Sequence, residues 1–503
     1  MSITPVRRIV VVGGGTAGWM SAAALSRLIG PAASVQLVES DEIGIIGVGE
    51  ATIPHIRVFN EALGIDENEF LRATQGTFKL GIEFVNWARQ GDRYVHGFGK
   101  IGHEYAGVPF HHYWLRLHAE GLAPTLGPYS INTAAPAQAK FMRPRPDMAG
   151  SPLADIAYAF HFDASLYARF LRGFAERHGA QRIEGRIVRV EQREADGFIS
   201  AVVLQSGERV EGDFFIDCSG LRGLLIEQTL KAGFEDWSHW LPCDSAIAVP
   251  SAPTAPLLPI TRSTAHDAGW QWRIPLQHRV GNGHVFSSRF MDDAEATRLL
   301  LQHLDGEPLA SPRTVRFVPG RRKTFWDRNC VAVGLSSGFL EPLESTSIHL
   351  IQTAITRLVS FFPHAGFDRA DIDEYNEQMR FEYERIRDFI ILHYHATERT
   401  DTAFWNYTRT MPIPDTLRRK IELFRSNGRI VREGQELFVE LSWLQVLVGQ
   451  RILPRGRHPF ADLPPRAEVQ ELLANIEQVV GKCVGVMPTA ADFIAANCKA
   501  PAP

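Results

Sequence analysis

The sequence predicts an α/β protein built on a parallel β-sheet and completed by a mainly helical C-terminal part. Three observations lead to this fold class. An apolar run at residues 9–12 passes through a glycine-rich turn into a helical stretch. Two later segments, 212–220 and 329–338, again pass from an apolar run into a glycine turn. From about residue 381 onward the pattern of apolar residues is mainly helical.

The first element is a strand, a turn and a helix at the start of the chain. The apolar run Ile9 to Val12 predicts a buried parallel strand, and Trp19 to Leu28 predict a helix. Between them, Gly13 permits a tight turn, Gly15 lets the backbone approach a pyrophosphate, and Gly18 lets the helix pack on the strand. The N-terminus of this helix supplies N–H groups for an anion.

The second strand ends in the acidic residue that a dinucleotide site needs. Residues 34–38 predict a strand that ends at Glu39, about twenty residues after Gly18. A carboxylate at this place can accept a hydrogen bond from a ribose 2′-OH. Strand, glycine turn, helix and distal acid together favour dinucleotide binding over a tight turn that binds no ligand.

The two later glycine segments favour FAD over NAD. Asp217 ends the apolar run of the first segment, and Gly334 lies in the turn of the second. One βαβ unit covers only the ADP half of a flavin nucleotide, so the chain must return to the cofactor elsewhere. The sequence contains no second GxGxxG unit for a nicotinamide cofactor. We therefore expect reduced FAD to be made by another protein.

Length and charge limit the class of protein. The chain has 503 residues, of which 45% are hydrophobic and 22% charged, and a net charge of −4. A chain of this length and composition can form one large body and a C-terminal subdomain. The three cofactor segments lie within residues 1–380, which we expect to form the body, and residues 381–503 predict the mainly helical subdomain. The negative charge argues against nucleic acid or an anionic membrane as a partner.

The chain carries no sign of export, of a membrane span or of a metal site. The predicted fold begins within about ten residues of Met1, and no apolar stretch reaches the roughly twenty residues that a membrane span needs. We therefore expect a cytoplasmic protein. The five cysteines are widely spaced and odd in number, which indicates buried or incidental thiols rather than a disulfide framework or a zinc site.

Four further segments carry a resemblance to a known family. They are Gly47 to Pro54, Lys79 within Thr77 to Gly81, the Trp-x-Trp-x-Ile-Pro signature at Trp270 to Pro275, and Glu344-Ser345-Thr346. With the glycine-rich turn, the chain resembles the flavin-dependent tryptophan halogenases over nearly its whole length. This resemblance implies an FAD-binding fold like that of glutathione reductase and the aromatic hydroxylases, with a helical C-terminal subdomain that completes the substrate pocket. Gly47 to Pro54 is similar to the family's strap between flavin and substrate chambers.

The resemblance implies a reaction and the residues that perform it. Reduced FAD, O2 and chloride or bromide give hypohalous acid, which halogenates an electron-rich aromatic held apart from the flavin. Lys79 occupies the place of the family's catalytic lysine. A lysine suits this role because an amine among apolar walls can capture or hydrogen-bond the oxidant. Glu344 matches the essential glutamate, which stabilises the arenium cation and takes its proton. The backbone N–H groups of Thr346 and Ser347 are expected to hold the halide, and Ser347 replaces a glycine that is more frequent in the family.

The resemblance also implies the other ligand-binding residues. His96 and Phe98, within His96-Gly97-Phe98-Gly99, are expected to hold an indole ring between two aromatic planes. Trp270 and Trp272 are expected beside the flavin, although their pattern alone equally predicts one face of a core strand. The expected cofactor-binding residues are Gly13, Gly15, Thr16, Ala17, Gly18, Glu39, Ala51, Ile187, Asp217, Gly334 and Leu335.

The C-terminal part bears on the substrate and on the partners. Family members that act on free tryptophan carry a tyrosine pair and a glutamate there, whereas residues 441–450 carry neither. An ammonium buried without a carboxylate partner is strongly disfavoured. We therefore expect an indole without the amino-acid group, an indole-bearing peptide or a larger aromatic compound. The resemblance implies a separate NAD(P)H-dependent flavin reductase as partner and makes a homodimer plausible.

Two other functions remain open at this point. A flavin monooxygenase that hydroxylates an aromatic ring would bring its substrate against the flavin and would not need a distant lysine, so Lys79 argues against it. A flavin-binding protein without turnover is disfavoured by the presence of both Lys79 and Glu344. Taken singly, Lys79 would be a surface lysine and Glu344 an acid at the start of a helix.

Overall fold

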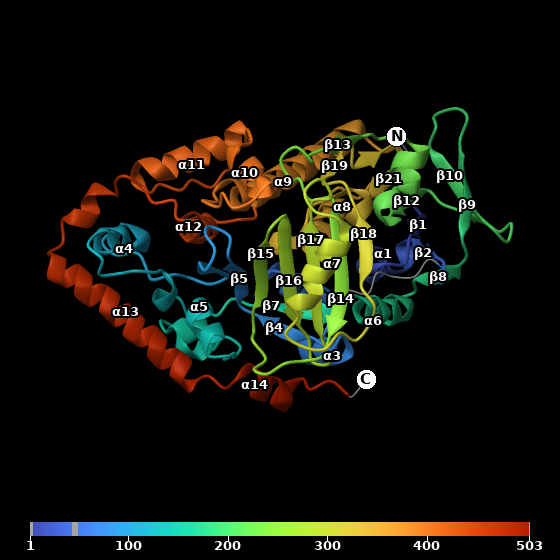
Figure 1. Ribbon diagram of the computed structural model, residues 1–503. Helices are drawn as coiled ribbons and strands as arrows, with labels where there is room; N and C mark the ends of the chain where they lie inside the picture. Colours follow the sequence, from blue (N-terminus) through green and yellow to red (C-terminus); the bar gives the residue numbers. More distant parts are fainter. Residues whose placement is uncertain (1–3, 43–48, 502–503) are drawn as a thin grey trace. The chain divides into compact units, whose positions relative to one another are not determined.

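A computed structural model describes residues 4–42 and 49–501 of the chain (Figure 1). The chain forms two compact units. Unit 1 consists of Met1–Gly76, Phe162–Asp244 and Arg316–Glu384, and unit 2 of Thr77–His161, Ser245–Val315 and Arg385–Pro503. The C-terminal stretch from Arg385 therefore packs in one unit with two earlier stretches of the chain.

The centre of unit 1 is a six-stranded sheet in the order β20-β21-β12-β1-β2-β8. β1 lies between β12 and β2 and is parallel to both, with Val12 opposite Asp217 and Val38. The carboxyl ends of these three strands therefore share one edge of the sheet, where the glycine turn follows β1. The strands are β1 (Arg8–Val12), β2 (Ser34–Glu39), β8 (Gln181–Glu184), β12 (Phe214–Asp217), β20 (Trp326–Asp327) and β21 (Cys330–Ala332).

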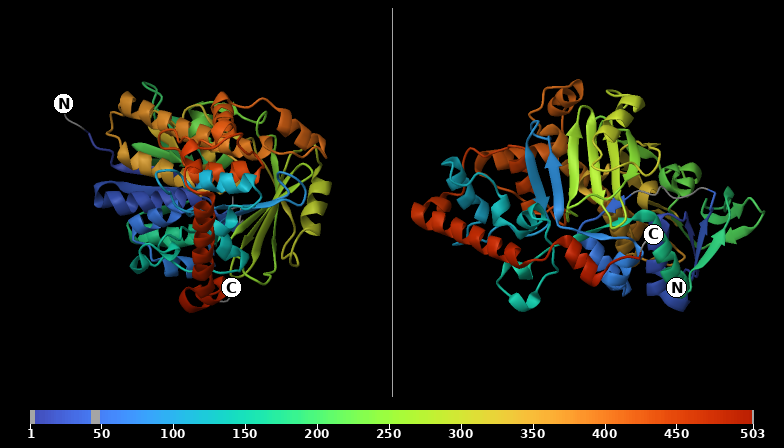
Figure 2. Two further views of the ribbon diagram at one scale, coloured as in Figure 1. Left: turned by 90° about the vertical axis from the view of Figure 1, so that its left-hand side faces the viewer. Right: turned by 60° about the horizontal axis from the view of Figure 1, so that its bottom comes forward.

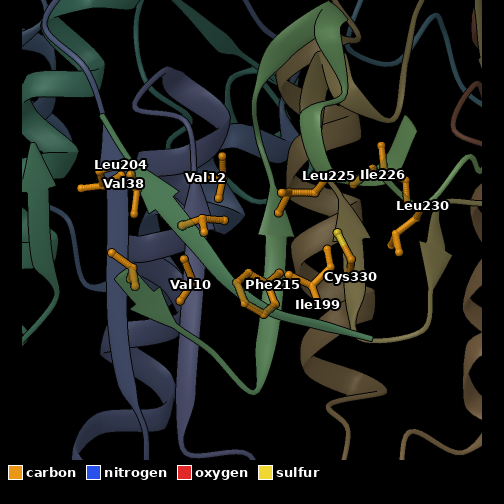
Figure 3. Packing of buried hydrophobic residues seen from close by; sticks show 13 residues of the cluster. Val10, Val12, Val38, Ile199, Leu204, Phe215, Leu225, Ile226, Leu230 and Cys330 are labelled. Atoms are coloured by element: carbon orange, nitrogen blue, oxygen red, sulfur yellow. The ribbon is translucent and has the colours of Figure 1, made fainter. Parts of the chain in front are cut away.

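A hydrophobic cluster fills one face of this sheet (Figure 3). Val10 and Val12 of β1 and Phe215 of β12 contribute from the sheet, and Leu225 and Ile226 cover them from the helical turn after β12. The apolar run predicted as a buried strand thus forms the core of unit 1, which confirms that prediction.

The remaining elements of unit 1 surround the sheet. α1 packs against α6, and α8 contacts both α1 and α2. In Figure 1 the β9–β10 hairpin extends away from the six-stranded sheet. These elements are α1 (Thr16–Ile29), α2 (His55–Leu63), α3 (Glu67–Ala73), α6 (Ala164–Arg177), α8 (Ser347–Ser360), β3 (Gly49–Ala51), β9 (Ile187–Gln192), β10 (Ile199–Leu204), β11 (Arg209–Glu211), β13 (Phe234–Asp236), β19 (Gly320–Arg322) and β22 (Gly338–Phe339).

Unit 2 is built on a seven-stranded sheet in the order β18-β14-β17-β16-β15-β5-β6. β15 and β5 are parallel, whereas β14, β17, β16 and β15 follow one another antiparallel. A separate antiparallel pair, β4 and β7, places Thr77 opposite His161. The strands are β4 (Thr77–Lys79), β5 (Gly81–Val85), β6 (Arg93–Gly97), β7 (Ala159–Asp163), β14 (Ser245–Ser251), β15 (Thr261–His266), β16 (Gly269–Pro275), β17 (Val280–Phe286) and β18 (Arg313–Arg316).

Helices supply the rest of unit 2. The long helix α13 packs beside α4 and α5, as Figure 2 shows. α9 (Arg369–His395) crosses from unit 1 into unit 2 at Glu384. The others are α4 (Phe110–Ala119), α5 (Ile131–Ala137), α7 (Asp293–Gln302), α10 (Ala403–Thr410), α11 (Asp415–Asn427), α12 (Glu440–Gly449), α13 (Arg466–Val486) and α14 (Ala490–Asn497).

Two sequence-level features can be placed on this fold. All five cysteine side chains are buried, as predicted. Among the helices of the described residues, none is both long and apolar enough to cross a membrane.

Candidate active site

The glycine turn of unit 1 is a place where side chains are excluded. Gly13 has φ of 111°, and a Cβ atom there would lie 2.3 Å from the carbonyl oxygen of Cys218. At Gly18 a Cβ atom would lie 1.8 Å from the carbonyl oxygen of Gly13, so the helix packs on the turn only without a side chain. At Gly15, by contrast, no atom of residues 4–42 or 49–501 lies within 4 Å of the added Cβ.

The same turn ends in an accessible helix N-terminus. α1 begins at Thr16, earlier than the predicted Trp19, because Gly15 in extended conformation serves as its N-cap. Residues 13–17 are partly exposed, whereas the helix is buried from Gly18 to Ser26. Because no side chain caps the helix, its first N–H groups can bind a phosphate. This geometry fits the pyrophosphate of a dinucleotide such as FAD.

Glu39 lies directly against this turn. A Cβ atom added to Gly14 would lie 1.4 Å from Oε2 of Glu39, so the carboxylate occupies the space that glycine leaves. Its other oxygen, Oε1, accepts a hydrogen bond of 2.5 Å from Nε of Arg182 on β8. The ion pair fixes the Glu39 side chain beside the glycine turn, where a ribose hydroxyl is expected.

The glycine segment at Gly334 meets the start of α1. Gly334 has φ of 73°, and a Cβ atom there would lie 2.6 Å from Cβ of Ala17. The next residue, Leu335, is 37% exposed despite its apolar side chain. Two of the predicted cofactor segments are therefore adjacent in unit 1.

The carboxylate of Asp217 holds the third cofactor segment together by accepting hydrogen bonds from the residues that follow it. One carboxylate oxygen accepts hydrogen bonds from the N–H and the hydroxyl of Ser219, and the other from the N–H groups of Leu225 and Ile226. These four bonds use the lone-pair sites of the carboxylate. Asp217 therefore holds the turn in place, and a cofactor contact is expected from the turn's backbone rather than from this side chain.

The last two predicted cofactor residues, Ala51 and Ile187, lie on strands of unit 1. Ala51 is buried in β3, and Ile187 is half-buried against the core cluster of Figure 3. Of the predicted strap, Gly47 and Val48 lie outside the described residues.

Glu344 and the expected halide-binding residues form one compact turn in unit 1. Glu344 is 1% exposed and ends a short 3-10 helix, and Ser345 then adopts a left-handed conformation with φ of 59°. Thr346 follows as the N-cap of α8, which begins at Ser347. The buried Thr346 hydroxyl has no hydrogen-bond partner within the described chain. The positive end of a fourteen-residue helix therefore lies beside an unused hydroxyl, which suits a small anion.

Lys79 lies in unit 2, at the end of β4. Its side chain is completely buried, and Nζ lies 5.2 Å from the centroid of the Phe98 ring. The backbone N–H of Phe98 donates to the carbonyl of Leu80 over 3.0 Å. Two residues predicted to face the substrate are therefore adjacent and tied together through the backbone.

A buried histidine supports the strand that carries Lys79. Nδ1 of His161 lies 3.0 Å from Oγ1 of Thr77, which donates its own proton to the carbonyl of Pro275. Nε2 of His161 is 2.8 Å from Oγ1 of Thr261. Burial and the nearby positive charge of Lys79 hold the pKa of His161 well below its usual value. A neutral His161 therefore fixes β4 without adding a second charge.

His96 and Phe98 lie on either side of Gly97, whose backbone is bound by a side chain of α12. The Gln445 side chain accepts a hydrogen bond from the N–H of Gly97 and donates one to its carbonyl. His96 is 3% exposed, and its ring centroid lies 6.2 Å from that of Phe438. The predicted substrate-binding pair is therefore anchored on one side by an amide side chain.

Trp270 and Trp272 point from the same face of β16, and their ring centroids are 6.2 Å apart. Trp270 also lies 6.5 Å from Trp87, and the Trp272 ring covers the space that Gly283 leaves on β17. The two rings thus pack within unit 2, as the core-strand alternative predicts. A role beside the flavin stays a prediction.

Comparison with known proteins identifies the family. The tryptophan halogenase family model matches residues 8–466. The chain is 33% identical to tryptophan 7-halogenase RebH of Lentzea aerocolonigenes, over 97% of this chain and 98% of that protein. It is 51% identical to a flavin-dependent halogenase from Xanthomonas campestris, with a TM-score of 0.96 and coverage of 99% and 100% of the two chains. For the flavin-dependent halogenase BrvH from Brevundimonas sp. BAL3 the identity is 47%, the TM-score 0.94 and the coverage 99% of each chain.

The chain belongs to the tryptophan halogenase family. The family, the FAD-binding fold and the enzyme class predicted from the sequence are thereby confirmed. Flavin-dependent halogenases use FAD, O2 and chloride or bromide, and a separate flavin reductase supplies the reduced flavin.

Three side chains that support this halogenase site were missed at the level of sequence. Arg182 and His161 act through partners far away in the chain, and no motif marks them. Gln445 did carry a signal, because it is a polar residue within the otherwise apolar run Trp443 to Val448. A buried amide in such a run requires hydrogen-bond partners.

Proposed function

We propose that this halogenase acts on an indole that lacks the amino-acid group, or on a related electron-rich aromatic. The observation that supports this most directly is the buried Lys79 ammonium over the Phe98 ring, next to His96. An aromatic substrate can stack in such surroundings, and the amine can present the oxidant to it.

When bound, FADH2 would supply two electrons and two protons, which together with one further proton would convert O2 and a halide ion into hypohalous acid and water and leave oxidised FAD. The hypohalous acid then gives its halogen to a ring carbon, the ring loses a proton from that carbon, and water is the second product. Each further role belongs to a side chain or backbone group of this protein. We assign the glycine turn, Glu39 and the Ala17–Gly334 contact to binding the cofactor.

Lys79 and Glu344 take the two catalytic roles in this proposal. A lysine buried next to an aromatic ring is shielded from water, which keeps a halogenating species from being lost to bulk solvent. The buried carboxylate of Glu344 can stabilise the positive charge of the arenium ion and accept its proton. Thr346 and Ser347 at the start of α8 are proposed to hold the halide.

The absence of a grip for an amino acid supports a substrate other than free tryptophan. α12 carries no ionisable side chain between Leu441 and Gln450. The buried Lys420 beneath it already pairs with Glu436 and lies 5.0 Å from the Trp443 ring. The zwitterionic end of tryptophan would need buried opposite charges that these residues do not offer.

We propose that the protein works in the cytoplasm with a separate NAD(P)H-dependent flavin reductase, and as a homodimer. Its net charge of −4 supports a small-molecule substrate rather than nucleic acid or an anionic membrane.

The test is product analysis with matched substrates. The protein is incubated with FAD, a flavin reductase, NADH and either chloride or bromide, and with indole or tryptophan in parallel. We expect a halogen isotope pattern on indole and little on tryptophan. Equal halogenation of tryptophan would contradict the substrate proposal, and addition of oxygen without halogen would contradict the reaction.

A further inference from the structure

Gln445 forms two hydrogen bonds with a single backbone unit. Its Oε1 accepts from the N–H of Gly97 over 2.8 Å, and its Nε2 donates to the carbonyl of Gly97 over 3.0 Å. The Gln445 side chain also donates to the carbonyl of Leu441 on its own helix. Gln445 is 5% exposed, so these bonds are shielded from water.

The place of Gly97 explains why such a side chain is needed. β6 is the last strand at its end of the seven-stranded sheet, with β5 on one side, and Gly97 is the final residue of β6. On an edge strand the outward N–H and C=O groups have no neighbouring strand to pair with. The Gln445 amide takes the place of that strand, because it offers one acceptor and one donor side by side.

Gly97 is the residue between His96 and Phe98. Fixing both polar groups of its backbone fixes the orientation of the two adjoining peptide planes, and therefore the directions of the side chains on either side. Phe98 in turn lies under Nζ of Lys79. A movement of Gly97 would thus change both the aromatic surfaces and the distance between Phe98 and Lys79.

We propose that Gln445 is a positioning residue that holds His96 and Phe98 for an aromatic substrate through Gly97. The proposal rests on the function proposed above for His96 and Phe98. It adds a residue of α12 that acts on the substrate through the backbone of β6. It also explains why α12 keeps an amide in a run that is otherwise apolar.

The chain offers a matched control on the same helix. Gln450, the C-cap of α12, is 1% exposed and donates to the carbonyl of His393 over 2.9 Å and to the hydroxyl of Tyr94 over 3.4 Å. Replacing Gln450 by leucine removes a buried amide from α12 but leaves the bonds to Gly97 in place. Effects shared by the Gln450→Leu and Gln445→Leu proteins therefore report on the helix alone.

The first experiment compares Gln445→Leu, Gln450→Leu and the unaltered protein, each loaded with FAD. Hydrogen exchange is followed by mass spectrometry in peptides that cover residues 96–99 without Tyr94, and the Kd for indole is measured by equilibrium dialysis. We expect Gln445→Leu to speed exchange in these peptides and to raise Kd and KM about tenfold, from the loss of two hydrogen bonds. We expect kcat to change less than KM, and Gln450→Leu to leave exchange in these peptides and the Kd unchanged.

The second experiment uses Gln445→Glu and a pH series. A carboxylate can accept from the Gly97 N–H but repels its carbonyl, whereas a protonated carboxyl group can both accept and donate. The KM for indole should therefore rise with pH in the Gln445→Glu protein more steeply than in the unaltered protein. A role in helix packing alone would give no such difference between the two pH profiles.

Three results would overturn the proposal. They are an unchanged Kd in Gln445→Leu, an equal rise in Gln450→Leu, and failure of the unaltered protein to bind indole. If indole binds but is not halogenated, the proposed function fails, while the dialysis still decides the role of Gln445.

Discussion

The ammonium of Lys79 lies 5.2 Å from the centroid of the Phe98 ring, inside unit 2 and out of contact with solvent. Lys79 is the last residue of β4 and Phe98 directly follows β6, and a backbone hydrogen bond from Phe98 to Leu80 keeps them adjacent. A cation over an aromatic face is stabilised by the ring, and the strength of this attraction rises when water is excluded.

Removing the Lys79 ammonium should stop halogenation without affecting cofactor binding. For Lys79→Met we expect the rate of indole bromination to fall by about 10²–10⁴-fold, the range found for positioned catalytic groups. The measurement is product formation by mass spectrometry, with flavin affinity followed by fluorescence. Lys100→Ala, at an exposed lysine of the same unit that pairs with Asp155, is the control and should keep full activity. A comparable rate in Lys79→Met would contradict the catalytic assignment.

The close packing at Gly18 predicts a specific loss of FAD. In Gly18→Ala the added Cβ would lie 1.8 Å from the carbonyl oxygen of Gly13, so the turn must open. We expect FAD affinity to fall at least about tenfold, because the N–H groups of the turn are displaced by an ångström or more. In Gly173→Ala, on α6, the nearest atom would be 3.6 Å away, and replacing a helical glycine should stabilise unit 1 by about 1 kcal/mol. Unchanged FAD affinity in Gly18→Ala would show that the turn does not bind the cofactor.

Two histidines of unit 2, the half-buried His266 and the buried His284, should make the protein sensitive to mild acid. Burial lowers the pKa of His266 to about 3 and that of His284 to about 4. In the unfolded chain both groups accept protons near pH 6.5, so the unfolded state binds more protons below that pH. Stability should therefore fall as the pH drops from about 6.5 toward 4, by up to ~1.4 kcal/mol per pH unit for each histidine.

Thermal unfolding between pH 6.5 and 4.5 tests this dependence before most carboxylates are protonated. His284→Asn keeps a donor for the carbonyl of Ala296, which lies 3.2 Å from Nδ1 of His284. We expect a shallower pH slope in His284→Asn and an unchanged slope for the exposed His103→Asn. Equal pH slopes in the unaltered protein, His284→Asn and His103→Asn would be inconsistent with a buried, neutral His284.

A buried ion-pair network in unit 1 acts in a lower pH range. Burial would raise the pKa of Glu382, but the hydrogen bond from His349 and the charge of Arg357 lower it to about 2. Its stabilising contribution is complete above the unfolded pKa near 4.5 and is lost as the pH falls toward 2.

Glu382→Ala should therefore be costly at neutral pH. It leaves Arg357 and His349 without their shared partner, and we expect a loss of about 3–5 kcal/mol at pH 7. Glu377→Ala, at an exposed pair with Arg380 on the same helix, should cost about 1 kcal/mol or less. Urea unfolding at pH 7 and pH 3 gives both numbers, and a loss for Glu382→Ala that does not shrink at pH 3 would refute the assignment.

The local parts of this fold could be read from the sequence because they depend on neighbouring residues. The run Ile9 to Val12 is β1 with one added residue, residues 34–38 are β2 with Glu39 added, and the tryptophan signature Trp270–Pro275 is β16 with Gly269 added. Hydrophobic periodicity and glycine turns determine such elements within a few residues. The motif that contains Lys79 was likewise sufficient to distinguish it from a surface lysine, and its side chain is buried.

Long-range relationships could not be read in the same way. Gln445 bonds a residue 348 positions away, and Arg182 pairs with Glu39 across 143 positions. Each unit is assembled from three separate stretches, so a division near residue 380 describes the order of the chain rather than its packing. Hydrophobic patterns indicate which side chains are buried but not which partner each one meets.

The burial of all five cysteines has a chemical consequence for an enzyme of this kind. Burial raises the pKa of the Cys218 and Cys330 thiols, so these groups stay protonated. The thiolate is the form that oxidants attack most readily, and attack also requires access. A catalyst that makes hypohalous acid thus keeps all five thiols away from solvent and these two in their least reactive form, and its working lifetime depends on the integrity of its core as well as on its active site.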